Sequence, residues 1–404
     1  MRTVIIILLV LAVAIGGVAF YLVATTPRSA EQVRVPLSTS HRALLATVPA
    51  AAESFALIPS AALLHDTLLA NPVTSAPVAK WTHEHELPRS WMLGAADIVA
   101  WKSGKKTSYA VRLDAFRALL VRVWLAAASN ADARWEGATL VMNDPVPSTS
   151  KVDLEPLLRL ASGLPSGDVL VVQRESARGA FPPIGRPAVS SVRIAKDEIF
   201  LVSRAATNDL QDEREIRATF PASAMLSASF ASPPRILTDL NRLLGTRIDA
   251  LVDDGGSISL YGVETGGLLP RPRGVIAMPA DEEGRRQLAE IRRYAELVGE
   301  TREAGNQLLI SFDRTSMSTY IEDATVPASW PATRWSLRID PPRLIPVLRK
   351  VGDNPALRFA SPRIHRAARD LRRWIDALQH AKSIEAADSV SGRVEELRVR
   401  VASK

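Results

Sequence analysis

A short phrase that occurs twice constrains the fold of this chain most strongly. "SPPRIL" at residues 232–237 and "DPPRLI" at residues 340–345 each follow alternating apolar residues and precede a Leu/Ile-rich segment. Apolar residues at every second position are typical of a half-buried strand, whereas a spacing of three or four is typical of a helix. Ser232 and Asp340 are good helix caps, and a proline directly after the cap removes no helical hydrogen bond. Each phrase therefore predicts a corner at which a strand turns into a helix.

The corners belong to a longer pattern that we find three times, beginning at Val48, Phe220 and Trp330. Each copy has a bulky residue, then Pro-Ala, an alternating apolar run, a proline and a helical pattern. Strand pairs with glycine-containing turns and amphipathic helices follow from Asp97 and from Ser257. Single helices between clusters of strands predict an α+β fold, with amphipathic helices packed against a mainly antiparallel sheet. Divergent duplication into two to three related repeat units explains the pattern, and chance similarity of proline-rich corners is the alternative.

The same pattern predicts how the chain is divided. We predict a transmembrane anchor at residues 1–25, a linker at 26–47, and α+β units at 48–218, 219–329 and 330–404. The last of these either folds as a third unit or completes a shared sheet. The linker begins with many Pro, Ser, Thr and charged residues, and we expect a short helix near residues 42–46.

The stretch from Val4 to Ala24 contains no charged residue. A helix of this length matches a hydrocarbon core of ~30 Å, and Tyr21 suits the membrane interface near one end. A cleavable signal peptide has a shorter apolar core of ~7–15 residues and a small-x-small cleavage site. The best candidate for such a site has Leu22 at its −3 position, which fits poorly. We therefore predict an uncleaved single-pass anchor, with a signal peptide as the alternative.

The positive charges around this stretch predict its orientation. Arg2 and the α-amino group lie closer to the apolar stretch than Arg28 and Arg34, which follow it. Positive charge favours the cytoplasmic side, so the N-terminus is expected inside and the large body outside.

Composition excludes several classes of function. The chain has no cysteine, which excludes disulfides, thiolate metal sites and cysteine nucleophiles. Its net charge of +7 comes from 50 Lys and Arg against 43 Asp and Glu. This modest excess is spread along the chain, so we predict no nucleic-acid partner. Anionic lipid headgroups explain the balance equally well.

The layout resembles a bacterial family of membrane-anchored envelope proteins of unknown function. Pro49-Ala50, Phe55–Ile58 and Leu63-Leu64 carry the resemblance, which covers most of the chain after the anchor. Members have one N-terminal span, a P-A-x-x opening before the first strand and a Leu-rich helix afterwards. The resemblance implies a protein of the bacterial inner membrane with a periplasmic body, and it supplies no catalytic residue.

The cluster "WTHEHELP" at residues 81–88 is the strongest candidate for a metal site. In an extended chain His83 and His85 project to one side, and Glu84 and Glu86 to the other. Two histidines on one face can bind zinc or copper, but the site needs further ligands. His65-Asp66 or His41 can supply one only if the fold brings them close. A solvated loop or edge strand is the alternative, and we predict no metal site.

Other motifs favour turns and solvated faces over chemistry. The chain has no G-x-S-x-G motif, and the glycine-rich segments 253–257 and 264–274 match neither a phosphate loop nor a dinucleotide fingerprint. Both are expected at hairpin turns. The arginines after the corners, Arg235 and Arg343, are either solvated or form an anion site. Those of the C-terminal helix are either solvated or contact anionic lipid or an acidic partner: Arg363, Arg366, Arg369 and Arg373.

Three functional hypotheses follow from the sequence. The first is a non-enzymatic, membrane-anchored scaffold or protein-binding protein in the cell envelope, with no cofactor. The second is a carrier of lipid or another apolar ligand, with Val192, Ile199 and Leu201 lining a pocket. The third is a membrane-tethered metal-dependent hydrolase built on His83 and His85. An exposed apolar patch over a filled core favours the first, and a large dry cavity favours the second.

Overall fold

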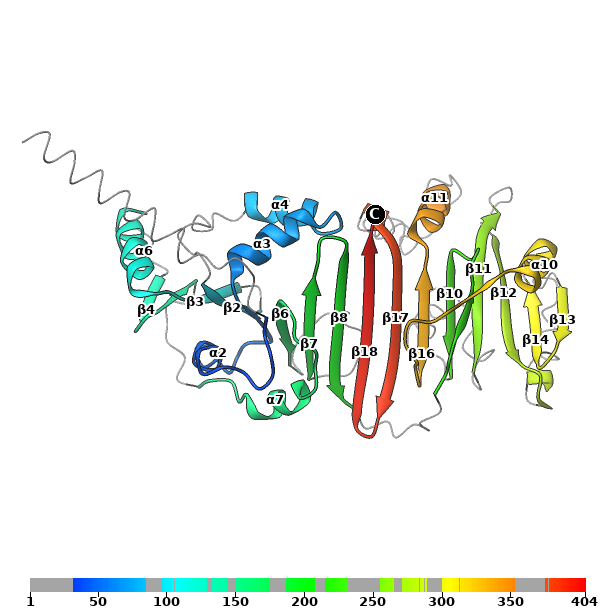
Figure 1. Ribbon diagram of the computed structural model, residues 1–404, viewed down its shortest axis with the longest axis horizontal. Coiled ribbons are helices and arrows are strands. Elements are labelled where there is room, and N and C mark those ends of the chain that lie inside the picture. The colour runs from blue at the N-terminus through cyan, green and yellow to red at the C-terminus, as the bar shows by residue number, and fades with distance from the viewer. Residues whose placement is uncertain are drawn as a thin grey trace, which may run out of the picture. The chain divides into compact units, whose positions relative to one another are not determined.

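The computed structural model shows two compact units, each built on an antiparallel sheet (Figure 1). The first unit comprises the chain up to Lys196 together with Val202–Ala206, and the second comprises Asp197–Leu201 and Thr207–Lys404. The structure describes residues 32–84, 96–104, 106–128, 133–143, 150–174, 187–207, 215–231, 255–264, 271–282, 284–286, 288, 300–311, 313–352, 375–376 and 378–404.

The predicted membrane anchor at Val4 to Ala24 lies outside the described residues. Among the residues that are described, no helix is both long enough and apolar enough to cross a membrane. The anchor therefore stays a prediction from the sequence.

The sheet of the first unit has the strand order β4-β5-β3-β2-β1-β6-β7-β8. Its strands are β1 (Ser54–Ile58), β2 (Asp97–Ser103), β3 (Lys106–Arg112), β4 (Ala133–Glu136), β5 (Thr139–Met142), β6 (Val169–Gln173), β7 (Ala188–Ile194) and residues 202–206 of β8 (Glu198–Ala206). The predicted glycine turn between β2 and β3 is present, with Gly104 at a φ of 60°. This left-handed conformation suits glycine because glycine has no Cβ.

Five described helices belong to the first unit: α2 (Thr39–Leu45), α3 (Ala61–Ala70), α4 (Ser75–Glu84), α6 (Ala115–Ala128) and α7 (Glu155–Ala161). Helix α2 contacts β2 and β3, and the Ser38 side chain caps it by accepting from the His41 amide. The helix expected near residues 42–46 is thus present, slightly earlier in the chain. Val33 also forms a bridge with Gly167, so the end of the predicted linker packs into the unit.

The sheet of the second unit has the strand order β13-β14-β12-β11-β10-β16-β17-β18. Its strands are β10 (Leu226–Phe230), β11 (Gly256–Glu264), β12 (Arg271–Pro279), β13 (Glu300–Ala304), β14 (Gln307–Ser311), β16 (Trp335–Ile339), β17 (Ala381–Ser391) and β18 (Val394–Ser403). Short strands β9 (Thr219–Pro221) and β15 (Thr325–Pro327) form a separate pair. Helices α10 (Arg314–Glu322) and α11 (Pro341–Gly352) complete the described elements.

The mainly antiparallel α+β fold predicted from the sequence is therefore confirmed. Strands β16 to β18 extend the sheet of β10 to β12, since β10 pairs with β16. Residues 330–404 thus contribute strands to a shared sheet. The glycine-rich segment 264–274 joins β11 to β12, whose ends pair at Glu264 and Arg271, as expected of a hairpin connection.

The two sheets have the same strand order and the same pairing register, apart from a bulge between Leu260 and Gly262 of β11 that β2 lacks. In the first unit Leu57 of β1 lies opposite Val99 of β2 and Leu170 of β6. In the second unit Ser229 of β10 lies opposite Ser257 of β11 and Ser336 of β16. Outward from β1 in one sheet and from β10 in the other, each described strand of the first sheet has a counterpart in the second, and the separate pair β9 and β15 stands outside this correspondence. Residues of the two units can therefore be compared position by position.

Both copies of the repeated phrase follow neighbouring central strands of the second sheet, β10 and β16. At "DPPRLI", β16 ends at Ile339, Asp340 accepts from the Arg343 amide at 3.2 Å, and α11 begins at Pro341, as predicted. "SPPRIL" directly follows β10, but its residues lie outside the described part of the chain. The opening of a bulky residue followed by Pro-Ala has a further copy, Leu164-Pro165-Ser166, which precedes β6 and was missed in the sequence because serine replaces alanine.

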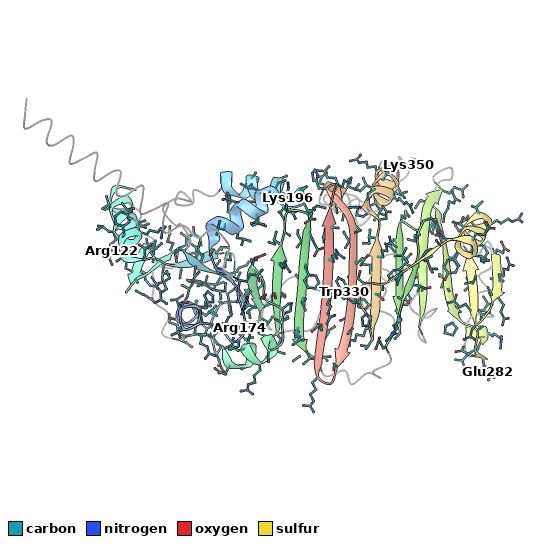
Figure 2. The ribbon with its side chains drawn as sticks, viewed as in Figure 1. Arg122, Arg174, Lys196, Glu282, Trp330 and Lys350 are labelled. Atoms are coloured by element: carbon teal, nitrogen blue, oxygen red, sulfur yellow. The ribbon has the colours of Figure 1, made fainter. Side chains whose placement is uncertain are left out.

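An arginine secures the Pro-Ala segment in both units. The Arg174 guanidinium, labelled in Figure 2, donates to the carbonyl oxygens of Ala50 and Ala52. In the second unit Arg343 Nη1 donates to the Ala222 carbonyl oxygen at 2.9 Å. Arg174 follows β6, which pairs with β1, the strand after Pro49-Ala50. Arg343 follows β16, which pairs with β10, the strand after Pro221-Ala222. The Pro-Ala opening recurs because each copy leads the chain into a central strand of a sheet.

Both units bury well-packed apolar residues. In the first unit the inner side of α6 covers β3 and β5 through Val111, Leu113, Ala118, Val121, Leu125, Leu140 and Met142. In the second unit the two faces of the sheet carry separate clusters. One contains Phe230, Ile276, Met278, Leu288, Leu308 and Ile310, and the other contains Val275, Ala277, Leu309 and Met317 of α10.

Candidate protein-binding surface on helix α6

The residues of the metal-site hypothesis, which we do not favour, are only partly described. His83 lies in α4 and not in an extended segment, so the predicted projection of two histidines from a strand is wrong there. The helix forms because Pro77 falls in its first turn, where the missing N–H has no helical partner to lose. His85 and Glu86 lie outside the described residues.

The other histidines of this hypothesis have local partners. His65 Nδ1 lies 3.6 Å from the Asp66 carboxylate, and the buried His41 lies 3.5 Å from the Asp97 carboxylate. Within the described ranges, no group of three or more histidine or carboxylate side chains is arranged to hold a metal ion.

Of the arginine candidates, the structure describes Arg343 only. Arg343 is held by the Ala222 carbonyl and lies 3.5 Å from the Asp340 carboxylate, so it secures the corner at which α11 begins. Arg235 and the arginines predicted on the C-terminal helix, from Arg363 to Arg373, lie outside the described residues. Val192, Ile199 and Leu201, expected to line an apolar pocket, are each half-buried.

Helix α6 carries the most exposed large apolar side chains of the described residues. Its start is fixed by Asp114, whose carboxylate accepts from the amides of Phe116 and Arg117 at 3.1 and 2.9 Å. The Arg117 guanidinium also donates to this carboxylate at 2.6 Å. Burial raises the pKa of Asp114, but the hydrogen bonds from Arg117 outweigh it and hold the pKa below its usual value. The carboxylate is therefore a stable anionic cap for the helix.

The outer side of α6 exposes two large aliphatic side chains. Leu119 is 58% exposed and Val123 is 64% exposed, although both lie on a helix that already buries Val121 and Leu125. Residues four apart lie on the same side of a helix, so Leu119 and Val123 form one ridge. Of the large apolar residues classed as exposed in the described chain, these two are the most exposed. We name this surface the α6 ridge.

A cation and an aromatic ring lie beside the α6 ridge. The Arg122 guanidinium carbon lies 4.7 Å from the centre of the Trp135 ring, within the range of a cation–π interaction. Figure 2 shows the labelled Arg122 on α6. Arginine and tryptophan are the residue types most enriched among energetically important contacts in protein interfaces. The ridge therefore combines apolar area with groups suited to protein recognition.

The second unit shows that the α6 ridge is not required by the fold. Its counterpart helix is also capped by an aspartate, since Asp281 accepts from the Gly284 amide at 2.8 Å. Counted from the two caps, buried Leu288 matches buried Val121, and exposed Arg286 matches exposed Leu119. The inner position stays apolar in both units, whereas the outer position is charged in one and aliphatic in the other.

The α6 ridge was not predicted from the sequence, where the helix after Asp114 is expected only to be amphipathic. The signal was present, because Leu119, Leu120, Val121, Val123 and Leu125 surround most of the helix. A helix that is apolar on nearly all sides needs a covering on each of them.

Comparison with known protein families, curated proteins and solved structures gives no match.

Proposed function

We propose that this protein is a membrane-anchored, non-enzymatic scaffold of the bacterial envelope that binds a partner protein through the α6 ridge. The observation that carries the proposal is the exposure of Leu119 and Val123 above a filled core. Burying an aliphatic side chain of this size is worth about 1.5–3 kcal/mol, so a partner gains substantially by covering both.

The geometry favours an amphipathic helix as the partner element. Two aliphatic residues four apart form a ridge that fits the groove of another helix. Arg122 lies beside them, so an acidic residue at the edge of the partner helix complements the surface. The proposed partner therefore presents leucine-like residues at its centre and carboxylates at its rim.

The membrane anchor and the repeated body belong to this proposal. The uncharged stretch from Val4 to Ala24 supports a single span, with the body in the periplasm and attached to the inner membrane. The shared strand order and register of the two sheets support an origin by duplication. After a duplication, one copy can maintain its surface while the other acquires a binding surface.

The other hypotheses have less support. The described residues of the carrier hypothesis are half-buried side chains in ordinary strands, and the metal hypothesis lacks a described ligand set. No described feature favours either over the scaffold.

Co-purification from native membranes tests the proposal. The full-length protein would be solubilised in mild detergent as wild type, as the double variant Leu119→Asp/Val123→Asp, and as Ile321→Asp. Ile321 is also an exposed apolar residue on a helix, 41% exposed, and is the matched control. We expect the double variant alone to lose a stoichiometric partner. Equal recovery of all bound proteins by the three forms would contradict the proposal.

A further inference from the structure

One face of the second sheet is polar at positions where the first sheet is apolar. In the first unit these positions, all at most 4% exposed, are Phe55, Leu57, Val99, Trp101, Leu170 and Val172. By strand order and register, their counterparts in the second unit are Ser227, Ser229, Ser257, Ser259, Ser336 and Arg338. We name the second set the serine face.

The serine face is a continuous cluster across three strands. Ser227 of β10 lies opposite Ser259 of β11 and Arg338 of β16, and the two hydroxyls are 3.2 Å apart. Ser229 lies opposite Ser257 and Ser336. Directly opposed residues in antiparallel strands have Cβ atoms about 4.5–5.5 Å apart, so one small ligand can reach several of these side chains.

Three polar atoms on this face are buried without a hydrogen-bond partner. They are Ser336 Oγ, Arg338 Nη1 and the hydroxyl of Tyr261. Tyr261 lies at a bulge of β11 and packs against the cluster of Val275 and Ala277, the residues opposite Ser259 and Ser257. Ser336 is only 1% exposed. Burial raises the pKa of Tyr261, and the charge of Asp323 raises it further, so the phenol stays protonated. All three atoms can therefore donate a hydrogen bond.

The carboxylates near Arg338 are directed elsewhere. Glu385 of β17 lies opposite Arg338, but its carboxylate accepts from the Ser329 hydroxyl. Asp340, two positions after Arg338, lies close to Arg343. Asp323, whose charge acts on Tyr261, accepts from the amide and hydroxyl of Ser223. Within the described part of the chain, no ion pair accounts for the Arg338 charge.

Buried donors without acceptors are costly to a fold, and the first unit shows that the same positions can be filled with apolar side chains. A ligand that brings acceptor oxygens and negative charge can satisfy Ser336 and Arg338, which lie two positions apart on the same side of β16. Guanidinium and hydroxyl groups suit phosphate in particular, since arginine makes directed, charge-assisted hydrogen bonds to its oxygens. We propose that the serine face binds a phosphate group, with Arg338 as its cation and Ser336 as a hydroxyl donor.

Phosphate binding to the full-length protein in detergent tests this inference. Inorganic phosphate would be titrated at constant ionic strength, with chloride as the balancing anion, and affinity measured by calorimetry. We expect saturable binding that weakens at least about tenfold in Arg338→Met and about threefold in Ser336→Ala. The control is Arg398→Met, which removes an arginine of β18 that lies 2.7 Å from the Glu396 carboxylate.

A second arm identifies the source of the phosphate. Thermal stability would be compared in phosphatidylcholine vesicles with and without phosphatidylglycerol. Stabilisation by the anionic lipid that is lost in Arg338→Met, without binding of free phosphate, would assign the site to a lipid headgroup. Failure of both probes, or equal responses of wild type, Arg338→Met and Ser336→Ala, would overturn the inference. Ser336→Ala keeps the test decisive if Arg338→Met does not fold.

Discussion

The two units of this protein share a strand order and a register, yet matched positions carry different chemistry. Leu57 lies buried between Val99 and Leu170, whereas its counterpart Ser229 lies between two serines. On the helix that follows the β2–β3 or β11–β12 hairpin, an exposed leucine in one unit is an arginine in the other. The two units share helix-capping side chains, turns from strand to helix, and strands with alternating inward and outward residues. These features suffice to specify the sheet. The identity of the residues on each face is then free to diverge.

A buried ion cluster is a second difference between the units. Asp388 of β17 lies opposite Trp335, and Val192 occupies the corresponding position opposite Val169 in the first unit. Asp388 and Glu395 are both almost fully buried, and Arg334 Nη1 lies 3.8 Å from one carboxylate and 2.6 Å from the other. The second unit thus depends on charge balance where the first depends on apolar packing.

Removing the cation of this cluster should have the largest effect on stability. Arg334→Met leaves two buried carboxylates without their shared cation, which costs about 3–5 kcal/mol. Hydrogen exchange of β16 to β18 in the full-length protein measures the loss, and strands of the first unit should be unaffected. The exposed Arg398→Met is the control, at about 0–1 kcal/mol. A loss for Arg334→Met no larger than the control would show that the cluster does not stabilise the unit.

Truncating matched residues of the central strands should give the next largest effect. Leu57→Ala removes a fully buried leucine and should cost about 2–5 kcal/mol in the first unit. Ser229→Ala, at the corresponding position, should cost less than about 1 kcal/mol because it removes one hydroxyl. Chemical denaturation, with hydrogen exchange to assign the unit, checks both values. Similar losses for the two variants would contradict the contrast between an apolar and a polar face.

Asp388 should make the second unit more stable in mild acid. Burial, and then the charge of Glu395, raise the pKa of Asp388 to about 7, while Arg334 lowers it. The unfolded chain has the ordinary value near ~3.9, so between these values the folded state binds more protons. Stability contributed by the protonated carboxyl is present at low pH and is lost as the pH rises through about 7.

Replacing this carboxyl isolates its contribution. Asp388→Asn should stabilise the second unit at pH 8 by on the order of 2 kcal/mol and reduce the pH dependence between pH 4 and 7. Hydrogen exchange of β17 at several pH values measures both the stabilisation and the pH dependence. The control is Asp340→Asn, at a more exposed carboxyl. An unchanged pH profile would show that Asp388 does not titrate in this range.

Charging the α6 ridge should have the smallest effect on stability. Leu119 and Val123 point outward, so Leu119→Asp/Val123→Asp should change the free energy of unfolding by no more than about 0.5 kcal/mol per site. Val121→Ala, on the inner side of the same helix, should cost more because Val121 is fully buried. Thermal unfolding of the purified protein compares them. A large loss in the double variant would place the two side chains in the core.

Much of the fold could be predicted from the sequence because the local signals are strong. The corner at Asp340 has a capping side chain and a proline at the first helical position, and it begins α11 as expected. The strands around it alternate, and Gly104 provides the left-handed turn of a hairpin. These features act over a few residues, so they can be recognised without knowing the rest of the chain.

The serine face could not be predicted for a physical reason. The segments "MLSASF" and "RWSLRI" alternate, which predicts half-buried strands. Ser227 and Ser259 are instead buried, because both faces of this sheet carry packed clusters. Alternation identifies two faces of a strand but does not say whether either faces solvent.

Site-specific photo-crosslinking in intact cells tests the central claim most directly. A photoreactive residue would replace Leu119 in one form of the full-length protein and its counterpart Arg286 in another. We expect a discrete protein adduct from position 119 and none from position 286, since only the first unit has an aliphatic ridge there. Equal adducts from both positions, or adducts to lipid alone from position 119, would contradict a protein-binding role for the α6 ridge.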